Sequence, residues 1–183
     1  LQENTLDWGR NSSPTFTDFN QDGLIDLVVG ASIEDGEGFG TVPRLIRMQN
    51  AGSIESPSFQ VIDENWLEIS TSLPSTDPVP AFGDFDQDGD VDMVVGLLDG
   101  SVHLFINQNG LTHSGILDLN GGESLIDFSA NPESVDLNND GFPDLLVGEG
   151  NGNINYFENS GIPGEIQFSI SNENLGGINT TQT

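Results

Sequence analysis

Short apolar segments alternate with polar, glycine-rich turns along most of the chain. Two of these segments, Val91–Val95 and Leu145–Val147, are nearly continuous apolar runs rather than alternating patterns. Such runs are typical of strands that are covered on both faces. The dipeptides Asp99-Gly100 and Asn151-Gly152 follow them closely and favour tight hairpins. With 23 glycines and few helix-forming runs, the pattern predicts an all-β chain.

One pattern recurs three times. The copies are TFTDFNQDGLIDLVVG (15–30), AFGDFDQDGDVDMVVG (81–96) and ESVDLNNDGFPDLLVG (133–148). Each copy leads into a glycine-bearing turn and a further apolar segment, at 44–52, 101–110 and 153–161. A fourth short segment follows at 58–62, 115–119 and 166–170. The repeat is therefore the organising unit of the chain.

Each unit predicts four antiparallel strands, with an acidic loop between the first two. Four strands in about 50 residues is the size of one β-propeller blade. We therefore expect three blades, at residues 11–65, 78–126 and 130–172, which form a partial propeller or part of a larger one. The extra stretches at 34–40 and 63–78 are interpreted as loops.

The three acidic loops, called loop 1 (18–26), loop 2 (84–92) and loop 3 (136–144), share the pattern D-x-[D/N]-x-D-G-x-x-D. Oxygen-bearing side chains at alternate positions let a tightly curled loop direct them at one centre, and glycine permits the sharp turn. The seventh residue can add its backbone carbonyl. The predicted ligands are Asp18, Asn20, Asp22, Leu24 and Asp26; Asp84, Asp86, Asp88, Asp90 and Asp92; and Asp136, Asn138, Asp140, Phe142 and Asp144.

Carboxylate, amide and carbonyl oxygens without His or Cys favour Ca²⁺ over zinc or copper, and Mg²⁺ demands a more compact octahedron. We expect three Ca²⁺ ions, one in each loop, with loop 2 binding most tightly because it has four side-chain carboxylates. The alternative is that Asp, Asn and Gly only make good turns. An EF-hand is excluded because its acidic ligand at position twelve would fall on Val29, Val95 or Val147.

The segments DFNQDGLIDLVVG, DFDQDGDVDMVVG and DLNNDGFPDLLVG resemble FG-GAP/VCBS repeats. These are the calcium-loop blades of integrin α-subunit propellers, a fungal propeller lectin and large secreted bacterial surface proteins. The resemblance implies a β-propeller in which an ion pins the hairpin between the first two strands of each blade. Family propellers have more than three blades, so we expect further blades from the same polypeptide or from self-association.

Composition narrows the choice of partners. The formal net charge is −27, with 30 acidic and three basic residues. Such a surface repels nucleic acids and anionic membranes, although the charge is also typical of a protein selected for solubility or high salt. No apolar run approaches the roughly 20 residues of a membrane helix. The chain has no cysteine, which excludes disulfides and thiolate metal sites.

Other candidate residues carry weaker signals. His103 and His113 are expected to be structural, without a partner at metal-ligand or triad spacing. Trp8 and Trp66 are expected to pack between blades or to stack on a sugar. Arg44 and Arg47 are expected to pair with aspartates or to recognise an acidic ligand. Glu34, Glu37, Glu64 and Glu68 offer carboxylates, but the sequence singles out no glycosidase pair.

The sequence thus predicts a non-catalytic, calcium-stabilised module for binding or adhesion, secreted or on the cell surface, with a protein or carbohydrate ligand. Two alternatives stay open. One is an accessory or catalytic propeller domain of a secreted polysaccharide-degrading enzyme. The other is a structural subunit of a surface filament or stalk.

Overall fold

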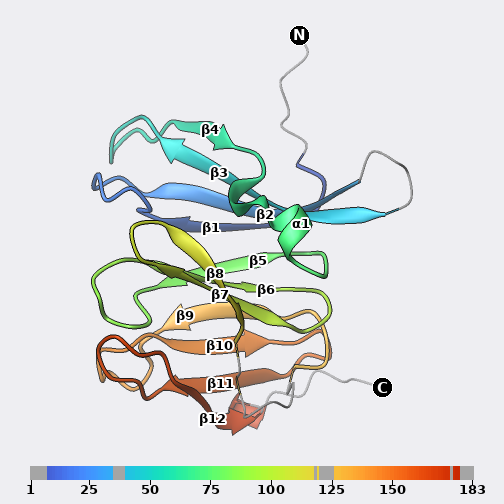
Figure 1. The fold of residues 1–183 in the computed structure, drawn as a ribbon, viewed down its shortest axis with the longest axis vertical. Coiled ribbons are helices and arrows are strands. Elements are labelled where there is room, and N and C mark those ends of the chain that lie inside the picture. The colour runs from blue at the N-terminus through green and yellow to red at the C-terminus, as the bar shows by residue number, and fades with distance from the viewer. Residues whose placement is uncertain (1–7, 35–39, 118, 120–125, 174, 178–183) are drawn as a thin grey trace. The chain divides into compact units, whose positions relative to one another are not determined.

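The structure, a computed structural model, describes residues 8–34, 40–117, 119, 126–173 and 175–177. The chain divides into two compact units, Leu1–Pro78 and Val79–Thr183. Within the described residues, the strands form three antiparallel sheets of four, each with its strands in chain order (Figure 1). The predicted fold of four-stranded, propeller-type blades is therefore confirmed.

The first unit contains one sheet, called blade 1. It is built from β1 (Arg10–Thr17), β2 (Asp26–Glu34), β3 (Thr41–Asn50) and β4 (Phe59–Asp63). Val29, Ala31, Ile46 and Met48 form a buried cluster on this sheet. The stretch 63–78, predicted as loop, contains the 3₁₀ turn η1 (Trp66–Glu68) and the short helix α1 (Ile69–Ser72). Trp66 and Ile69 are buried there. This was missed because so short a helix has no periodic pattern.

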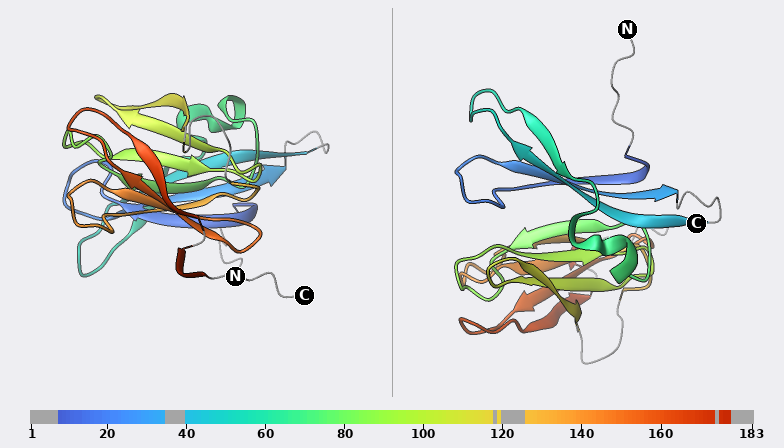
Figure 2. Two further views of the ribbon diagram at one scale, coloured as in Figure 1. Left: turned by 90° about the horizontal axis from the view of Figure 1, so that it is seen from below. Right: turned by 45° about the horizontal axis from the view of Figure 1, so that its top comes forward.

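The second unit contains two sheets. Blade 2 comprises β5 (Val79–Gly83), β6 (Asp92–Gly96), β7 (Val102–Asn107) and β8 (Leu111–Ile116). Blade 3 comprises β9 (Asn131–Val135), β10 (Asp144–Gly148), β11 (Ile154–Asn159) and β12 (Phe168–Glu173), and the 3₁₀ turn η2 (Leu175–Gly177) follows. Figure 2 shows the strands from two further directions.

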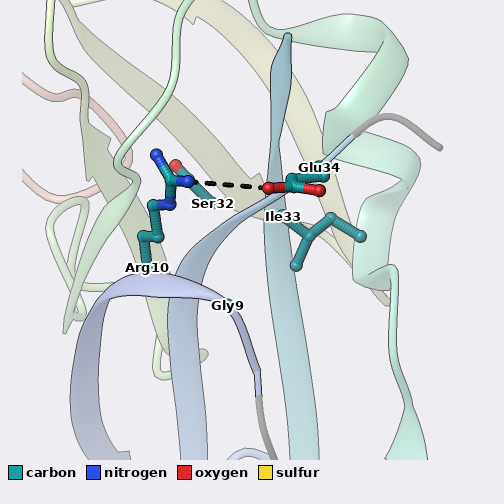
Figure 3. A pocket seen from close by; sticks show the side chains of 5 residues that line it. All are labelled: Gly9, Arg10, Ser32, Ile33 and Glu34. Atoms are coloured by element: carbon teal, nitrogen blue, oxygen red, sulfur yellow. Dashed lines mark ion pairs between the residues drawn. The ribbon is translucent and has the colours of Figure 1, made fainter. Parts of the chain in front are cut away.

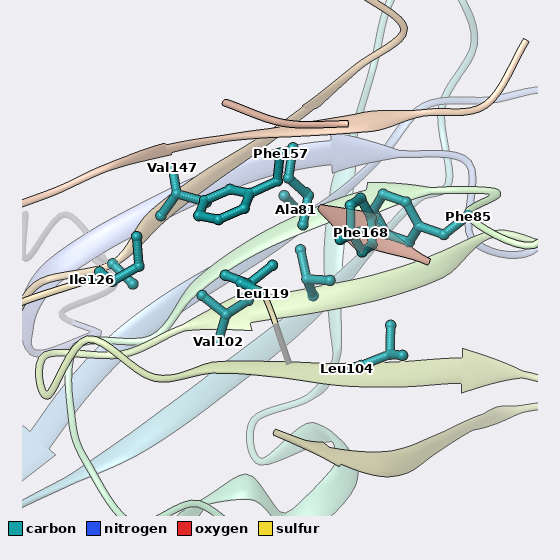
Figure 4. Packing of buried hydrophobic residues seen from close by; sticks show 12 residues of the cluster. Ala81, Phe85, Val102, Leu104, Leu119, Ile126, Val147, Phe157 and Phe168 are labelled. Atoms are coloured by element: carbon teal, nitrogen blue, oxygen red, sulfur yellow. The ribbon is translucent and has the colours of Figure 1, made fainter. Parts of the chain in front are cut away.

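The apolar runs lie where the sequence predicts. Every residue of β6 is buried, and Leu145 and Val147 of β10 are fully covered. The core of the second unit joins both blades: Ala81, Val94 and Val102 pack in one cluster with Val147 and Phe157 (Figure 4). Strands covered on both faces need no polar alternation, and this explains the continuous apolar runs.

The turns follow the chemistry of their residues. Gly100 and Gly152 adopt φ of +86° and +92° in the predicted hairpins. The fourth strand of blade 2 begins at Leu111, not at 115 as predicted. The reason is a tight turn in which the Gly110 N–H donates to Asn107 Oδ1 at 2.8 Å, so that the chain reverses at once.

Blades 2 and 3 approach each other closely at Gly96, and Gly148 is the corresponding glycine of blade 3. Replacing each glycine by alanine tests this packing. A Cβ on Gly96 of β6 would lie 2.3 Å from the carbonyl oxygen of Ala130, which precedes β9, whereas one on Gly148 of β10 would meet nothing nearer than 3.6 Å. We expect Gly96→Ala to lower the free energy of unfolding by about 1–3 kcal/mol through overpacking. Gly148→Ala should change it by less than about 0.5 kcal/mol. Urea unfolding in calcium measures both, and equal effects would contradict the packing described.

Candidate metal centre

Each acidic loop connects the first two strands of its blade. Loop 1 lies between β1 and β2, loop 2 between β5 and β6, and loop 3 between β9 and β10. The strand pairs are in register up to the loop, where Thr17 pairs with Asp26 and Gly83 pairs with Asp92. The hairpins therefore hold both ends of each loop at a fixed separation.

The first aspartate is the centre around which each loop curls. In loop 2, Asp84 accepts hydrogen bonds from the N–H groups of Asp88 and Gly89, both at 3.1 Å. Asp18 and Asp136 make the same pair of contacts in their loops, at 2.9–3.1 Å. The third and fifth side chains of each loop also accept backbone N–H groups. Three separate stretches of sequence thus adopt one hydrogen-bonding pattern.

Two positions in each loop have left-handed backbone. The glycines Gly23, Gly89 and Gly141 have φ of +86°, +96° and +97°. A Cβ on Gly23 or Gly89 would meet no atom within 4 Å, so backbone conformation alone requires glycine there. The fourth residues, Gln21, Gln87 and Asn139, have φ of +55° to +60°. The repeat pattern did not predict this second position, because two of its three residues are Gln, which rarely has left-handed backbone.

The last aspartate of each loop anchors it to the third strand. Asp92 is fully buried, and its two oxygens accept the N–H groups of Asn107 at 2.9 Å and Phe85 at 3.0 Å. Asp144 binds the N–H groups of Asn159 and Leu137 in the same way, and Tyr156 Oη donates to it at 2.8 Å. A carboxylate oxygen that accepts one hydrogen bond keeps a second lone pair for a cation.

Loop 1 has an incomplete version of this anchor. Asp26 Oδ1 accepts the N–H of Asn50 at 2.7 Å, whereas the buried Oδ2 has no hydrogen-bond partner. Burial raises the pKa of Asp26, and the carboxylates of Asp22 and Asp18 raise it further against the opposing effect of Asn50. A buried carboxylate oxygen without a donor fits a site completed by a cation.

Loop 2 brings three carboxylates together. Oxygens of Asp84, Asp86 and Asp88 all lie within 4.8 Å of one another. In loops 1 and 3 the middle residue is an amide, and Asn20 and Asn138 donate from Nδ2 to Asp22 and Asp140 at 2.9 Å. No such donor is possible from Asp86. Loop 2 therefore has the greatest repulsion for a cation to relieve.

The pKa directions agree with this picture. Burial raises the pKa of Asp86, and the neighbouring Asp88 and Asp84 raise it too. Burial raises the pKa of Asp92 to about 6, despite the hydrogen bonds from Asn107 and Phe85. The pKa of the exposed Asp22 is lowered, chiefly by the N–H of Leu24 and then by Asn20. A divalent cation in the loop would favour the charged form of every one of these groups.

The donor set therefore fits a hard divalent cation. The oxygen-bearing side chains of each loop are carboxylates and amides, which suit Ca²⁺. The number of ions stays a prediction, as do the backbone carbonyl ligands at Leu24, Asp90 and Phe142 and the full set of four side-chain ligands per loop.

The histidines differ from expectation, because each is the other's partner. His113 lies in β8, and its Nε2 is 3.0 Å from His103 Nδ1. Ser101 Oγ, which donates to Asp99 at 2.6 Å, is 3.2 Å from His103 Nε2. Because Ser101 Oγ uses its only proton on Asp99, it can accept a hydrogen bond from a proton on His103 Nε2. The sequence missed the pair because register across a hairpin brought them together.

The aromatic and basic residues of blade 1 have structural roles. The guanidinium of Arg47 lies 4.9 Å from the ring centroids of both Phe19 and Trp66. This cation–π contact gives Arg47 a structural role, and its pairing with an aspartate stays a prediction. Trp66 is only 9% exposed, so its ring is not available to stack on a sugar. Trp8 packs partly buried against the cluster of blade 1.

Blade 1 also has an open pocket of about 430 Å³, lined by Gly9, Arg10, Ser32, Ile33 and Glu34 (Figure 3). Arg10 Nη2 and Glu34 Oε1 form an ion pair at 3.5 Å, and both side chains are largely exposed. Ser32 Oγ donates to the carboxylate of Asp77, which is not a lining residue, at 2.6 Å and accepts the N–H of the same residue at 2.7 Å. Within these lining residues nothing forms a nucleophile–base pair. Glu37, another carboxylate considered from the sequence, lies outside the described residues.

Comparison with known proteins supports the repeat assignment. A family model described as the FG-GAP-like repeat matches residues 18–95 and 84–147. The two matches begin at the first aspartates of loops 1 and 2, and the second ends in β10. No curated protein matches the chain. Among the described residues, no helix is long and apolar enough to cross a membrane.

The histidine pair generates a pH prediction. Burial lowers the pKa of His103, and His113 lowers it further, against the opposing charge of Asp99. A histidine in the unfolded chain has a pKa of about 6.5, whereas the pKa of His103 in the folded protein is lower, so that folded His103 binds a proton less readily. Stability contributed by this group is therefore present above about pH 6.5 and is lost as the pH falls towards 5.

We expect His103→Gln to lose less stability than the parent protein between pH 7 and pH 5, measured by urea unfolding in saturating calcium. Parallel pH profiles for the two proteins would show that His103 is not the responsible group.

Proposed function

Because the chain belongs to the FG-GAP-like repeat family, we propose that it is an extracellular binding module whose blades are stabilised by calcium. The observation that carries this proposal is the shared geometry of the three loops, in which backbone N–H groups hold the oxygen-bearing side chains of the first, third and fifth residues in one pattern. The carboxylates of Asp84, Asp86 and Asp88 give the closest convergence.

Calcium in these loops stabilises the fold because the unfolded chain has no assembled site. Its binding free energy is then part of the folding free energy. The anchoring aspartates extend this effect into the blade, since Asp92 binds the backbone of Asn107 in β7. Relief of carboxylate repulsion in the loop thus strengthens the link between the first three strands.

An extracellular setting supplies the ion. Calcium outside cells is millimolar, which saturates even the weak sites of extracellular modules. FG-GAP-like repeats are usually found in extracellular proteins and are typically non-catalytic. The proposed partner is a protein or a carbohydrate, bound by the loops that connect the strands, and further blades from the same polypeptide or a second copy would extend the array.

The first test is removal of calcium. Saturating a site at about 100 times its Kd adds about 2.7 kcal/mol of stability, and about 1 kcal/mol raises Tm by about 2–4 °C for a chain of this size. Because the chain has three proposed sites, whose effects add, we expect Tm in 2 mM CaCl₂ to exceed Tm in EGTA by more than about 10 °C. Magnesium at the same concentration should give a much smaller shift. Equal melting temperatures in calcium and EGTA would refute the proposal.

The second test concerns the rank of the loops. Asp86→Asn gives loop 2 the amide that loops 1 and 3 already have, so we expect its calcium affinity to fall about three- to tenfold. The reverse change, Asn20→Asp, should strengthen loop 1. Isothermal titration calorimetry measures both variants against the parent. An unchanged tightest site in Asp86→Asn would show that loop 2 is not the strongest.

A further inference from the structure

Loop 2 is held by blade 3 as well as by its own blade. Asn159, at the end of β11, donates from Nδ2 to the carbonyl oxygen of Phe85 at 2.8 Å. The N–H of Gly164 donates to the carbonyl oxygen of Asp86 at 2.6 Å. Phe168 packs edge-on against Phe85, with the ring centroids 5.7 Å apart. The backbone of two consecutive residues in loop 2 is thus fixed by the neighbouring blade.

This contact explains a difference between the loops. Asp86 is only 5% exposed, whereas the corresponding residues Asn20 and Asn138 are exposed. The same backbone pattern forms in all three loops, so local conformation does not cause the burial. The hydrogen bond to Gly164 shows that the turn after β11 lies against this part of loop 2.

A side chain joins loop 2 directly to loop 3. Gln87 lies between the proposed ligands Asp86 and Asp88, and its Nε2 donates to the carbonyl oxygen of Gly141 at 2.6 Å. Gly141 is the glycine of loop 3, and its own N–H donates to Asp136 at 3.0 Å. In loop 2, the residue that donates this hydrogen bond is next in sequence to two proposed ligands. In loop 3, the residue that accepts it is hydrogen-bonded to a proposed ligand.

We propose that loops 2 and 3 bind calcium cooperatively, coupled by the hydrogen bond from Gln87 to Gly141. This inference rests on the proposed function, that the loops bind calcium. An ion in loop 2 orders the backbone on both sides of Gln87, and Gln87 in turn orders the peptide of Gly141. The loop that binds the second ion is then already partly ordered, so less conformational entropy is lost when that ion binds. Coupling of this kind acts equally in both directions.

The chain offers a matched control for Gln87. Asn139 occupies the corresponding position of loop 3, with φ of +60° against +55° for Gln87, and its side chain is exposed. Replacing either residue by Ala imposes the same left-handed strain and removes no proposed ligand. Only Gln87→Ala removes the hydrogen bond between the loops.

The experiment is a calcium titration of the whole ¹⁵N-labelled chain followed by NMR. The amide resonances of Gly89 and Gly141 report occupancy of loops 2 and 3 separately, because each N–H donates to the first aspartate of its loop. Disabling loop 3 with Asp140→Ala should raise the midpoint for Gly89 about fivefold, and disabling loop 2 with Asp88→Ala should raise the midpoint for Gly141 by the same factor. With Gln87→Ala added, each shift should shrink to less than about twofold, whereas Asn139→Ala should leave the Gly89 shift intact.

The possible outcomes distinguish failure of the proposed calcium binding from failure of the proposed coupling. If no resonance responds to millimolar calcium, the proposed function fails. If both loops bind calcium but Asp140→Ala leaves the calcium midpoint of the Gly89 resonance unchanged, the coupling is refuted and calcium binding stands. If Asp140→Ala unfolds blade 3 or Asp88→Ala unfolds blade 2, the single variants Gln87→Ala and Asn139→Ala test the coupling in otherwise intact protein. A lower Hill coefficient in Gln87→Ala alone supports coupling, and equal coefficients in the two variants overturn it.

Discussion

The convergence of carboxylates within nine-residue loops is the constraint on which the rest of the structure depends. Backbone N–H groups hold the oxygen-bearing side chains of all three loops in one pattern, and where carboxylates are brought together the arrangement is electrostatically costly without a cation. The cost is greatest in loop 2, where Asp84, Asp86 and Asp88 meet without an amide donor. Backbone N–H groups reduce it, since each first aspartate accepts two of them. They do not remove it, since Asp88 and Asp84 add to the effect of burial in raising the pKa of Asp86.

The loops are part of the fold and not additions to its surface. Their last aspartates are fully buried and bind the last residue of each third strand, as Asp144 binds Asn159. Asn159 then reaches the next loop, where it donates to the carbonyl oxygen of Phe85. In the second unit, the geometry of the acidic loops, strand pairing and contact between blades therefore share the same few residues.

Much of this architecture could be predicted from the sequence. The triple repeat gave the four-stranded blades, because continuous apolar runs and Asp-Gly or Asn-Gly turns act locally. The acidic loops could be located for the same reason. The anchoring role of Asp26, Asp92 and Asp144 could not, since it depends on a strand about 15 to 24 residues further along the chain.

Contacts that depend on strand register or on a neighbouring blade could not be predicted from the sequence pattern either. The pairing of His103 with His113 depends on the register of β7 and β8, which is shifted by an irregularity between Leu104 and Phe105. The bond from Gln87 to Gly141 spans 54 residues and two blades. Gln87 itself carries no signal, because a Gln between two aspartates reads as an ordinary exposed loop residue.

The central claim is that each loop encloses a divalent cation, and diffraction tests it most directly. Crystals of the chain grown in millimolar calcium and soaked with terbium should show anomalous peaks inside loops 1, 2 and 3, each surrounded by side-chain oxygens. A well-resolved map in which the side chains are ordered and the loops hold no anomalous peak would contradict the account.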